Sequence, residues 1–192
     1  MTSKIKVNIL ADGGDNSIIT SDGAGSFTAS SSLASSVQSV GGIQMTPAFY
    51  ATLSSDQTSS DDAWVKAQVN TEVLDTDGCY DNATNYRFTP TTSGKYYIFG
   101  QVCNEAETVG TLRSCYAAIY RNGSLYAFSD NNLNSTFGEY SRSLFVGTVV
   151  DFNGSTDYVE LYANMDVTSG TPKIGGGGSV RTFFGGYRII GA

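Results

Sequence analysis

Apolar and aromatic residues recur at short intervals from Thr46 onward, separated by polar turn residues. Tyr116, Ala118 and Tyr120 alternate with other residues, and residues 144–148 show the same alternation. A period of two is typical of a β-strand with one buried face. Short strands at regular spacing with Gly and Asn turns predict an all-β sandwich or barrel, and neither a long helix nor a fixed repeat is indicated.

Two turns between these runs are well marked. Asn122-Gly123 joins two alternating segments, and an Asn-Gly pair favours a two-residue hairpin because both residues tolerate positive φ. The segment Asp151–Asp157, with sequence DFNGSTD, is a second turn. These hairpins predict antiparallel neighbours.

The N-terminal segment has a different pattern. Ile5, Val7 and Ile9 alternate and predict a short strand, and Ile18 lies in a second extended piece between turn signals. A Ser-rich stretch follows, for which a short helix and a linker are both open. The segment cannot bury much by itself, so it is a flexible tail or a docking arm that folds against a partner. We favour the docking arm.

Length and charge limit the remaining possibilities. The 192 residues suit one domain with a small appendage, which we place at residues 1–44 (docking arm and Ser/Gly-rich linker) and 45–192 (head domain). The net charge of −7 disfavours nucleic acid as a partner. No run approaches the roughly 20 apolar residues that span a bilayer, so we expect no membrane insertion. The N-terminus does not resemble a signal peptide, and we expect assembly in a cytoplasm.

Catalytic chemistry has little support. His is absent, which removes Ser-His and Cys-His machinery, and without a CxxC pair zinc is not expected. Cys103 and Cys115 flank a plausible hairpin loop and could face each other on paired strands. With Cys79 the count is odd, so we favour buried thiols. We predict no enzyme activity, no catalytic residue, no metal and no cofactor.

Two further stretches resemble ligand loops only in part. Asp75, Asp77 and Asp81 supply hard oxygens, but the spacing and the terminal Glu of a calcium loop are missing, so we favour turn-forming Asp. Gly175–Gly178 lacks the Lys-Ser/Thr pair and the helix of a phosphate loop, and it predicts a flexible loop at the outer end of the head.

The segment Tyr80–Gly100 contains spaced aromatic residues. Tyr80 and Phe88 flank a turn, so both rings can return to one core. Gly94 permits a tight turn into the next strand. Within residues 95–99, rings point to both faces of that strand. A strand of this kind is either central in a sandwich or covered on its outer face by another subunit.

This motif resembles the jelly-roll family that includes the globular head of the first complement component and the tumour-necrosis-factor cytokines. The resemblance covers roughly residues 46–192. It departs from the family pattern at Val69, Ile98 and Gly100, where aromatic residues are usual, and by one extra residue after Asp81. The positions that carry it are Asp75, Tyr80, Asp81, Phe88, Gly94, Tyr96, the Arg121–Gly123 hairpin, the strand 157–161 and the closing strand 183–190 with Tyr187.

The resemblance implies an all-β antiparallel jelly-roll β-sandwich with a short N-terminal extended arm. It also implies a homotrimer packed through aromatic faces, and a monomer with surface tyrosines is the alternative. The arm resembles the docking arms of phage appendage proteins. We therefore predict a virion surface structural protein of a tailed bacteriophage, namely a head fibre, decoration protein or short tail fibre, attached to a capsid or tail protein. The alternative is a soluble complement-like or cytokine-like binding domain of a cellular organism.

The loops at the outer end of such a head are candidate contact surfaces. We nominate Asn131, Asn132, Asn134, Tyr140 and Gly176, because Asn, Gly and Tyr suit adaptable polar recognition. The hypothesis is weak binding of a host-surface glycan by each subunit, strengthened by trimeric avidity. Plain solvated loops are an equal alternative.

Overall fold

The computed structural model describes residues 9–11, 13–14, 17–21, 23–24, 27–29, 45–133 and 139–190. The chain divides into two units, residues 1–44 and 45–192, and each is described by itself. The predicted sites at Ile5, Val7 and Asn134 lie outside the described residues. Across the described ranges, no helix has the length and apolar character needed to cross a membrane.

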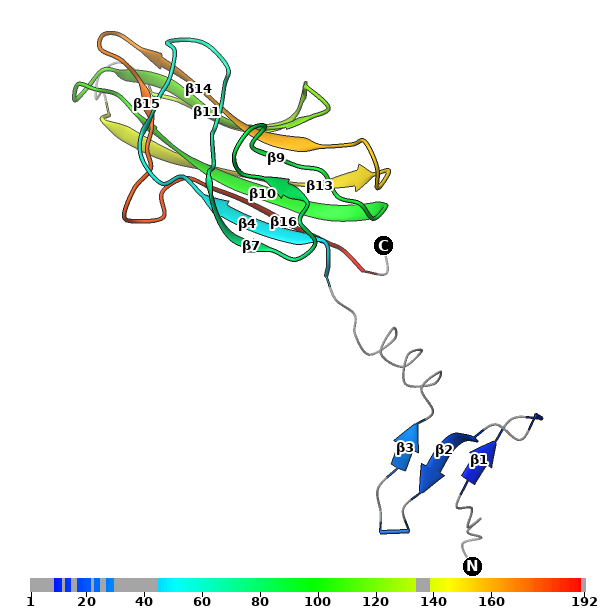
Figure 1. The fold of residues 1–192 in the computed structure, drawn as a ribbon. Coiled ribbons are helices and arrows are strands. Elements are labelled where there is room, and N and C mark those ends of the chain that lie inside the picture. The colour runs from blue at the N-terminus through cyan, green and yellow to red at the C-terminus, as the bar shows by residue number, and fades with distance from the viewer. Residues whose placement is uncertain are drawn as a thin grey trace, which may run out of the picture. The chain divides into compact units, whose positions relative to one another are not determined.

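The N-terminal unit contains a small antiparallel sheet of β1 (Ile9–Ala11), β2 (Ser17–Ser21) and β3 (Phe27–Ala29), with β2 in the middle (Figure 1). Ile9 begins β1 and is 54% exposed, and Ile18 lies half-buried in β2. Three strands this short bury little apolar surface, so such a sheet gains stability mainly by packing against something else. A docking role for Ile9 and Ile18 stays a prediction.

The head consists of two antiparallel sheets, seen as two layers in Figure 1. The first sheet is paired in the order β5-β15-β10-β16-β4-β7, and β13 pairs along the whole length of β10. Its strands are β4 (Ala48–Thr52), β5 (Gln57–Thr58), β7 (Thr71–Asp75), β10 (Gly94–Glu105), β13 (Ser141–Phe152), β15 (Lys173–Ile174) and β16 (Phe183–Arg188).

The second sheet is paired in the order β12-β11-β14-β9-β8, and β6 pairs with β14. Strands that are distant in sequence are neighbours in both sheets, which is the connectivity of a jelly roll rather than of a simple meander. The strands of the second sheet are β6 (Val65–Lys66), β8 (Tyr80–Asp81), β9 (Arg87–Phe88), β11 (Leu112–Arg121), β12 (Ser124–Asn132) and β14 (Val159–Val167).

The predicted Asn-Gly hairpin joins β11 to β12. Asn122 and Gly123 have φ of 52° and 78°, the left-handed values that a two-residue primed turn requires. The Asn122 side chain also donates to the Asp157 carboxylate at 2.8 Å, so the hairpin is tied to the neighbouring turn. The Asp157 carboxyl has a lowered pKa, chiefly because of this hydrogen bond.

Aromatic rings fill the space between the sheets. Phe88 stacks on Phe49 with ring centroids 4.3 Å apart, Tyr80 stacks on Phe49 at 4.9 Å, and Phe184 meets Phe49 edge-on at 5.0 Å. The buried Tyr80 hydroxyl donates to the Val69 carbonyl at 2.7 Å, and burial raises its pKa. The rings on either side of the 81–86 turn thus meet in one core, and the predicted jelly-roll sandwich is confirmed.

The cysteines are buried and free. Cys103 lies in β10 of the first sheet and Cys115 in β11 of the second, so the two do not face each other on paired strands. Burial raises the pKa of Cys115 to about 12. A thiol in this state packs as a small apolar group.

Candidate functional site

The outer face of the first sheet is lined by rings and aliphatic side chains. Residues directly opposite in an antiparallel pair point to the same side, and Tyr97 lies opposite both Val149 and Tyr187. Lys95 and Asp151 form the pair at the end of the same row. We name as the first-sheet face the residues Tyr50, Leu74, Tyr97, Phe99, Phe145, Val149, Phe183 and Tyr187.

Phe99 lies at the centre of this face. Its ring centroid is 5.8 Å from that of Tyr97, 6.3 Å from Phe183, 6.4 Å from Phe145 and 6.5 Å from Tyr50. The four neighbours come from β10, β16, β13 and β4, so one ring cluster spans four strands. Continuous clusters of this kind on an outer sheet face are typical of interaction surfaces rather than of solvated ones.

Two glycines keep the first-sheet face flat. Gly147 and Gly185 lie opposite Phe99 on the two neighbouring strands. A Cβ at Gly185 would lie 2.7 Å from the Phe99 ring, and one at Gly147 would lie 2.5 Å from the Tyr97 hydroxyl. Because these glycines have no Cβ, the rings of Phe99 and Tyr97 can pack directly against the backbone of the neighbouring strands.

Large apolar groups of the first-sheet face are open to solvent. Leu74, Phe145 and Val149 are 47%, 50% and 45% exposed. Soluble monomers rarely leave a contiguous apolar patch of this kind uncovered. The face is therefore a candidate protein–protein contact surface.

A second apolar surface lies on β12, the last strand of the second sheet. Leu125, Tyr126 and Phe128 are 46%, 44% and 54% exposed, and we name them the β12 edge. The Tyr126 hydroxyl donates to the Val149 carbonyl of β13 at 3.2 Å, which links the edge strands of the two sheets. Phe128 lies opposite Ala118 of β11 with its ring centroid 6.5 Å from that of Tyr116, so the β12 edge adjoins the outer face of the second sheet.

The outer face of the second sheet also contains rings. Trp64 meets Tyr116 and Tyr120 edge-on, with centroids 5.7 and 5.8 Å away, and Tyr120 stacks on Tyr162 at 4.0 Å. We name these four residues the second-sheet face. The charged residues Lys66 and Glu160 lie beside them, whereas the neutral Gln101 lies among the rings of the first-sheet face. Sequence reasoning missed this cluster because Trp64 precedes a two-residue strand and carries no periodic signal.

Glu160 is the main charged group beneath the second-sheet face. It is 4% exposed and its carboxylate accepts hydrogen bonds from Lys66 Nζ at 2.6 Å and from the Tyr162 hydroxyl at 3.4 Å. Burial, followed by the nearby Glu160 charge, raises the pKa of Tyr162 to about 12. The pair places one buried carboxylate under a row of tyrosines.

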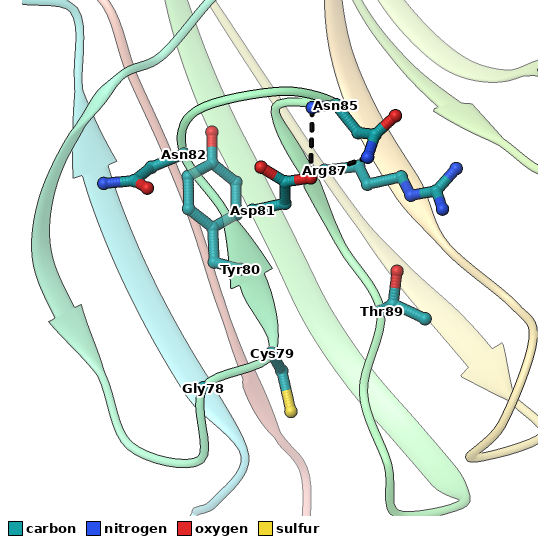
Figure 2. Close-up of a pocket in the computed structure, with 8 residues that line it drawn as sticks. All are labelled: Gly78, Cys79, Tyr80, Asp81, Asn82, Asn85, Arg87 and Thr89. Atoms are coloured by element: carbon teal, nitrogen blue, oxygen red, sulfur yellow. Dashed lines mark hydrogen bonds between the residues drawn. The ribbon is translucent and has the colours of Figure 1, made fainter.

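A polar pocket of about 560 Å³ opens beside the β8–β9 hairpin (Figure 2). Asp81 is the acidic residue among those that line it, and the figure shows Asn85 facing its carboxylate. That carboxylate accepts from the backbone N–H groups of Ala83, Thr84 and Asn85 and from the Asn85 side chain. The Thr84 N–H is the largest of the causes that lower the pKa of Asp81 to about 2. The acid therefore holds the turn together, and its oxygens are already engaged.

Asp75 has a similar structural role. Its two carboxylate oxygens accept from the backbone N–H groups of Cys79 at 3.0 Å and Tyr80 at 2.8 Å. No group of three or more His, Cys, Asp or Glu residues is arranged for a metal ion in the described part of the chain. These carboxylates fit the turn-forming role.

The nominated contact residues occupy different environments. Asn131 and Asn132 belong to strand β12 rather than to a loop, and Tyr140 is a 46% exposed loop residue. Gly176 is buried, which corrects the expectation of an outward loop there. Its N–H donates to Asp56 at 3.0 Å, and a Cβ would lie 2.4 Å from the Ser55 carbonyl oxygen.

The motif residues also divide by location. Tyr96 is buried, with its hydroxyl bonded to the Thr92 carbonyl at 2.7 Å, and burial raises its pKa to about 12. Gly94 begins β10 with φ of 135°, which few other residues adopt. Tyr187, the motif position of the closing strand, lies on the first-sheet face with its ring centroid 5.9 Å from that of Tyr97. The alternation along β16 does not show which of its two faces is buried.

One buried ion pair was not predicted. Glu105, 4% exposed, pairs with Arg181, whose Nη2 also lies 3.2 Å from Cys103 Sγ. Thr182 Oγ1 beside it accepts from the Cys103 N–H and donates to the Gly175 carbonyl. The group joins β10 to the segment before β16. The two charges lie 76 residues apart, so sequence spacing gave no signal.

Comparison with known proteins identifies the fold. No protein-family model and no curated protein matches the sequence. Among solved structures, Eiger TNF from S. frugiperda matches with a TM-score of 0.56 and 12% identity, covering 76% of this chain and 93% of that one. Murine APRIL matches with a TM-score of 0.51 and 12% identity, covering 74% of this chain and 98% of that one. The head of this protein therefore has a tumour-necrosis-factor-like jelly-roll fold.

Proposed function

We propose that the chain is a homotrimeric, non-catalytic surface protein of a tailed-bacteriophage virion, acting as a head fibre, decoration protein or short tail fibre. The observation that supports trimer formation is the exposed, flat first-sheet face around Phe99. Its companion is the β12 edge, a second apolar surface elsewhere on the same head.

Two different apolar surfaces favour a ring over a two-fold dimer. A two-fold contact uses the same patch on both partners, whereas a ring joins one patch to a different one on the next copy. In the proposed trimer the β12 edge of each copy packs on the first-sheet face of the next. Phe128 and Phe145, 54% and 50% exposed, then become buried. Three copies close the ring without leaving either surface open.

The engagement of the acids supports the proposed non-catalytic role. Asp75, Asp81 and Glu105 each hold backbone N–H groups or an arginine, and the sequence contains no His. No nucleophile with a matched base is therefore assigned. In the proposal the N-terminal unit attaches the head to a capsid or tail protein during assembly in the host cytoplasm.

A second candidate is a cytokine-like or complement-like binding domain of a cellular organism. The likeness of the head to Eiger TNF and murine APRIL favours it. Both candidates share the trimeric head and differ in what the N-terminal unit does. In the second candidate residues 1–44 bind no particle.

Light scattering on the full chain tests the trimer. The expected mass is three times the 20.3 kDa chain, unchanged on dilution. A monomer at all concentrations contradicts the proposal. Deletion of residues 1–44 should leave a trimeric all-β head that no longer attaches to virions. Electron microscopy of virions labelled with an antibody against the head measures the attachment. Virions without label in the wild type would favour the cellular alternative.

A further inference from the structure

The second-sheet face combines rings with hydrogen-bonding groups. Trp64 is 36% exposed, and Tyr116, Tyr120 and Tyr162 are half-buried beside it. Ala118, between the two tyrosines of β11, is fully buried on this outer side of the sheet. The rings therefore cover the strand surface while remaining partly exposed, and the Tyr162 hydroxyl is bonded to Glu160.

Polar side chains continue the same face toward one end. In the strand register Tyr116 lies opposite Asn164 of β14 on one side and Asp130 of β12 on the other. Ser114, the next residue of β11 on this side, lies opposite Asn132. Directly paired residues point to the same side, so a row of amide and carboxylate groups adjoins the ring cluster.

Asn164 is the observation that points to a ligand. The residue is 7% exposed, and its Oδ1 has no hydrogen-bond partner in the described part of the structure. A buried acceptor without a donor is costly, and such groups in native proteins usually serve a site. A hydroxyl group that reaches it past the Trp64 loop would supply the missing donor.

Charge restricts the class of ligand. Glu160 is already paired with Lys66, whereas Asp130 and Asp166 have no ion-pair partner among the described residues. An added anion here would meet carboxylates and a chain of net charge −7. A neutral molecule with both apolar faces and many hydroxyl groups fits rings beside amides and carboxylates.

We propose that the second-sheet face, with Asn164 and Asp130, binds a neutral oligosaccharide. The C–H face of a sugar ring packs on Trp64 and Tyr116. Its hydroxyl groups donate to Asn164 Oδ1 and to the Asp130 carboxylate. The site needs only a folded head. It places the host-glycan contact that the sequence suggested on the second sheet rather than on the loop of Tyr140.

The single Trp of the chain provides the measurement. The full chain is first applied to an array of neutral, sialylated and sulfated glycans, and neutral binders are then titrated while Trp64 emission is followed. We expect saturable emission changes with neutral oligosaccharides alone. If no neutral glycan binds, or if sulfated glycans bind better, the proposal is overturned.

Matched variants locate the site. Tyr116→Ala removes one packing ring and should weaken binding about tenfold. Tyr140→Ala removes a more exposed ring outside the face and should bind normally. Asn164→Leu should also weaken binding about tenfold, without a fall in melting temperature, because it removes an unpaired buried acceptor. Normal binding by Tyr116→Ala, with loss in Tyr140→Ala, overturns the assignment.

Light scattering on the same samples separates this proposal from the trimer. A monomeric chain that binds neutral glycans would contradict the trimer and support the oligosaccharide site. A trimer that binds no neutral glycan would contradict only the oligosaccharide site.

Discussion

The two outer faces of the head both contain aromatic rings, but the surrounding groups differ. On the first-sheet face Phe99 is ringed by Tyr50, Phe145 and Phe183, with glycines on the neighbouring strands. Charges lie at the two ends of this side of β10, Lys95 with Asp151 at one end and Glu105 with Arg181 at the other. On the second-sheet face the rings lie above the buried Glu160 and beside an unpaired amide.

The comparison shows that ring content alone does not define a surface. Rings on a flat, uncharged sheet fit a large protein surface, because burial of apolar area dominates such contacts. Rings beside unsatisfied polar groups fit a small ligand that supplies hydrogen bonds. The same strand alternation thus produces two surfaces suited to different kinds of partner.

The largest expected effect comes from a substitution in the core between the two sheets, which destabilises both outer faces together. Phe88 is fully buried against Phe49 and Tyr96. Phe88→Ala should cost about 3–5 kcal/mol, a large share of the roughly 5–15 kcal/mol that stabilises an ordinary domain. Urea unfolding measures this cost. Tyr116→Ala, on an outer face, serves as the control and should cost far less; an unchanged midpoint for Phe88→Ala would contradict the core assignment.

The next effect separates the two faces. Phe99→Asp places a charge at the centre of the first-sheet face, where burial against another copy would leave it unpaired. The mass in solution should fall from three times 20.3 kDa to one, with the β-sheet circular dichroism retained. Trp64→Asp, the matching change on the second-sheet face, should remain trimeric. Dissociation of both variants, or of neither, would show that the first-sheet face is not the contact.

How much of this comparison the sequence could predict depended on the range of the interactions. The Asn122-Gly123 hairpin and the two-sided strand around Phe99 follow from local rules, turn chemistry and a period of two. The location of Tyr187 did not, because alternation defines two faces without saying which is inside. Gly176 was misjudged for a related reason, since its burial comes from the distant Ser55 carbonyl.

The candidate sites were harder to predict than the fold. Trp64 joins Tyr116 only through strand pairing across the second sheet, a contact between residues 52 positions apart. The Glu160–Lys66 pair spans 94 positions. Nothing in the sequence spacing marks such pairs, and only the completed sheet register brings them together.

A smaller effect tests the charge under the second-sheet face. Glu160→Gln removes the acceptor charge from Lys66, which is 30% exposed and keeps its bond to the Asn85 carbonyl. The cost should be about 1–2 kcal/mol, less than for a fully buried pair, because Lys66 still reaches solvent. Urea midpoints measure it. Glu72→Gln, exposed on β7, should be neutral; equal midpoints for both variants would show that the buried pair contributes nothing.

The smallest effect concerns pH and the hairpin at the edge of the second sheet. The pKa of Asp81 is lowered to about 2, first by the Thr84 N–H, so its charged form stabilises the fold. This contribution is fully present above the unfolded pKa near 4 and is lost as the pH falls through about 2.

Solvent reaches Asp81, so the contribution should be only about 0.5–1 kcal/mol. Lowering the pH from 5 to about 2.5 should lower the protection factors for amide hydrogen exchange, which correct for the intrinsic pH dependence, at Ala83, Thr84 and Asn85 before it lowers those of β10. Asp81→Asn should flatten this pH dependence, since no proton is then taken up at that position. Mass-spectrometric exchange resolves the two segments. If the protection factors in the 83–85 turn and in β10 fall together, with the same profile in Asp81→Asn, the acid does not distinguish the two sheets.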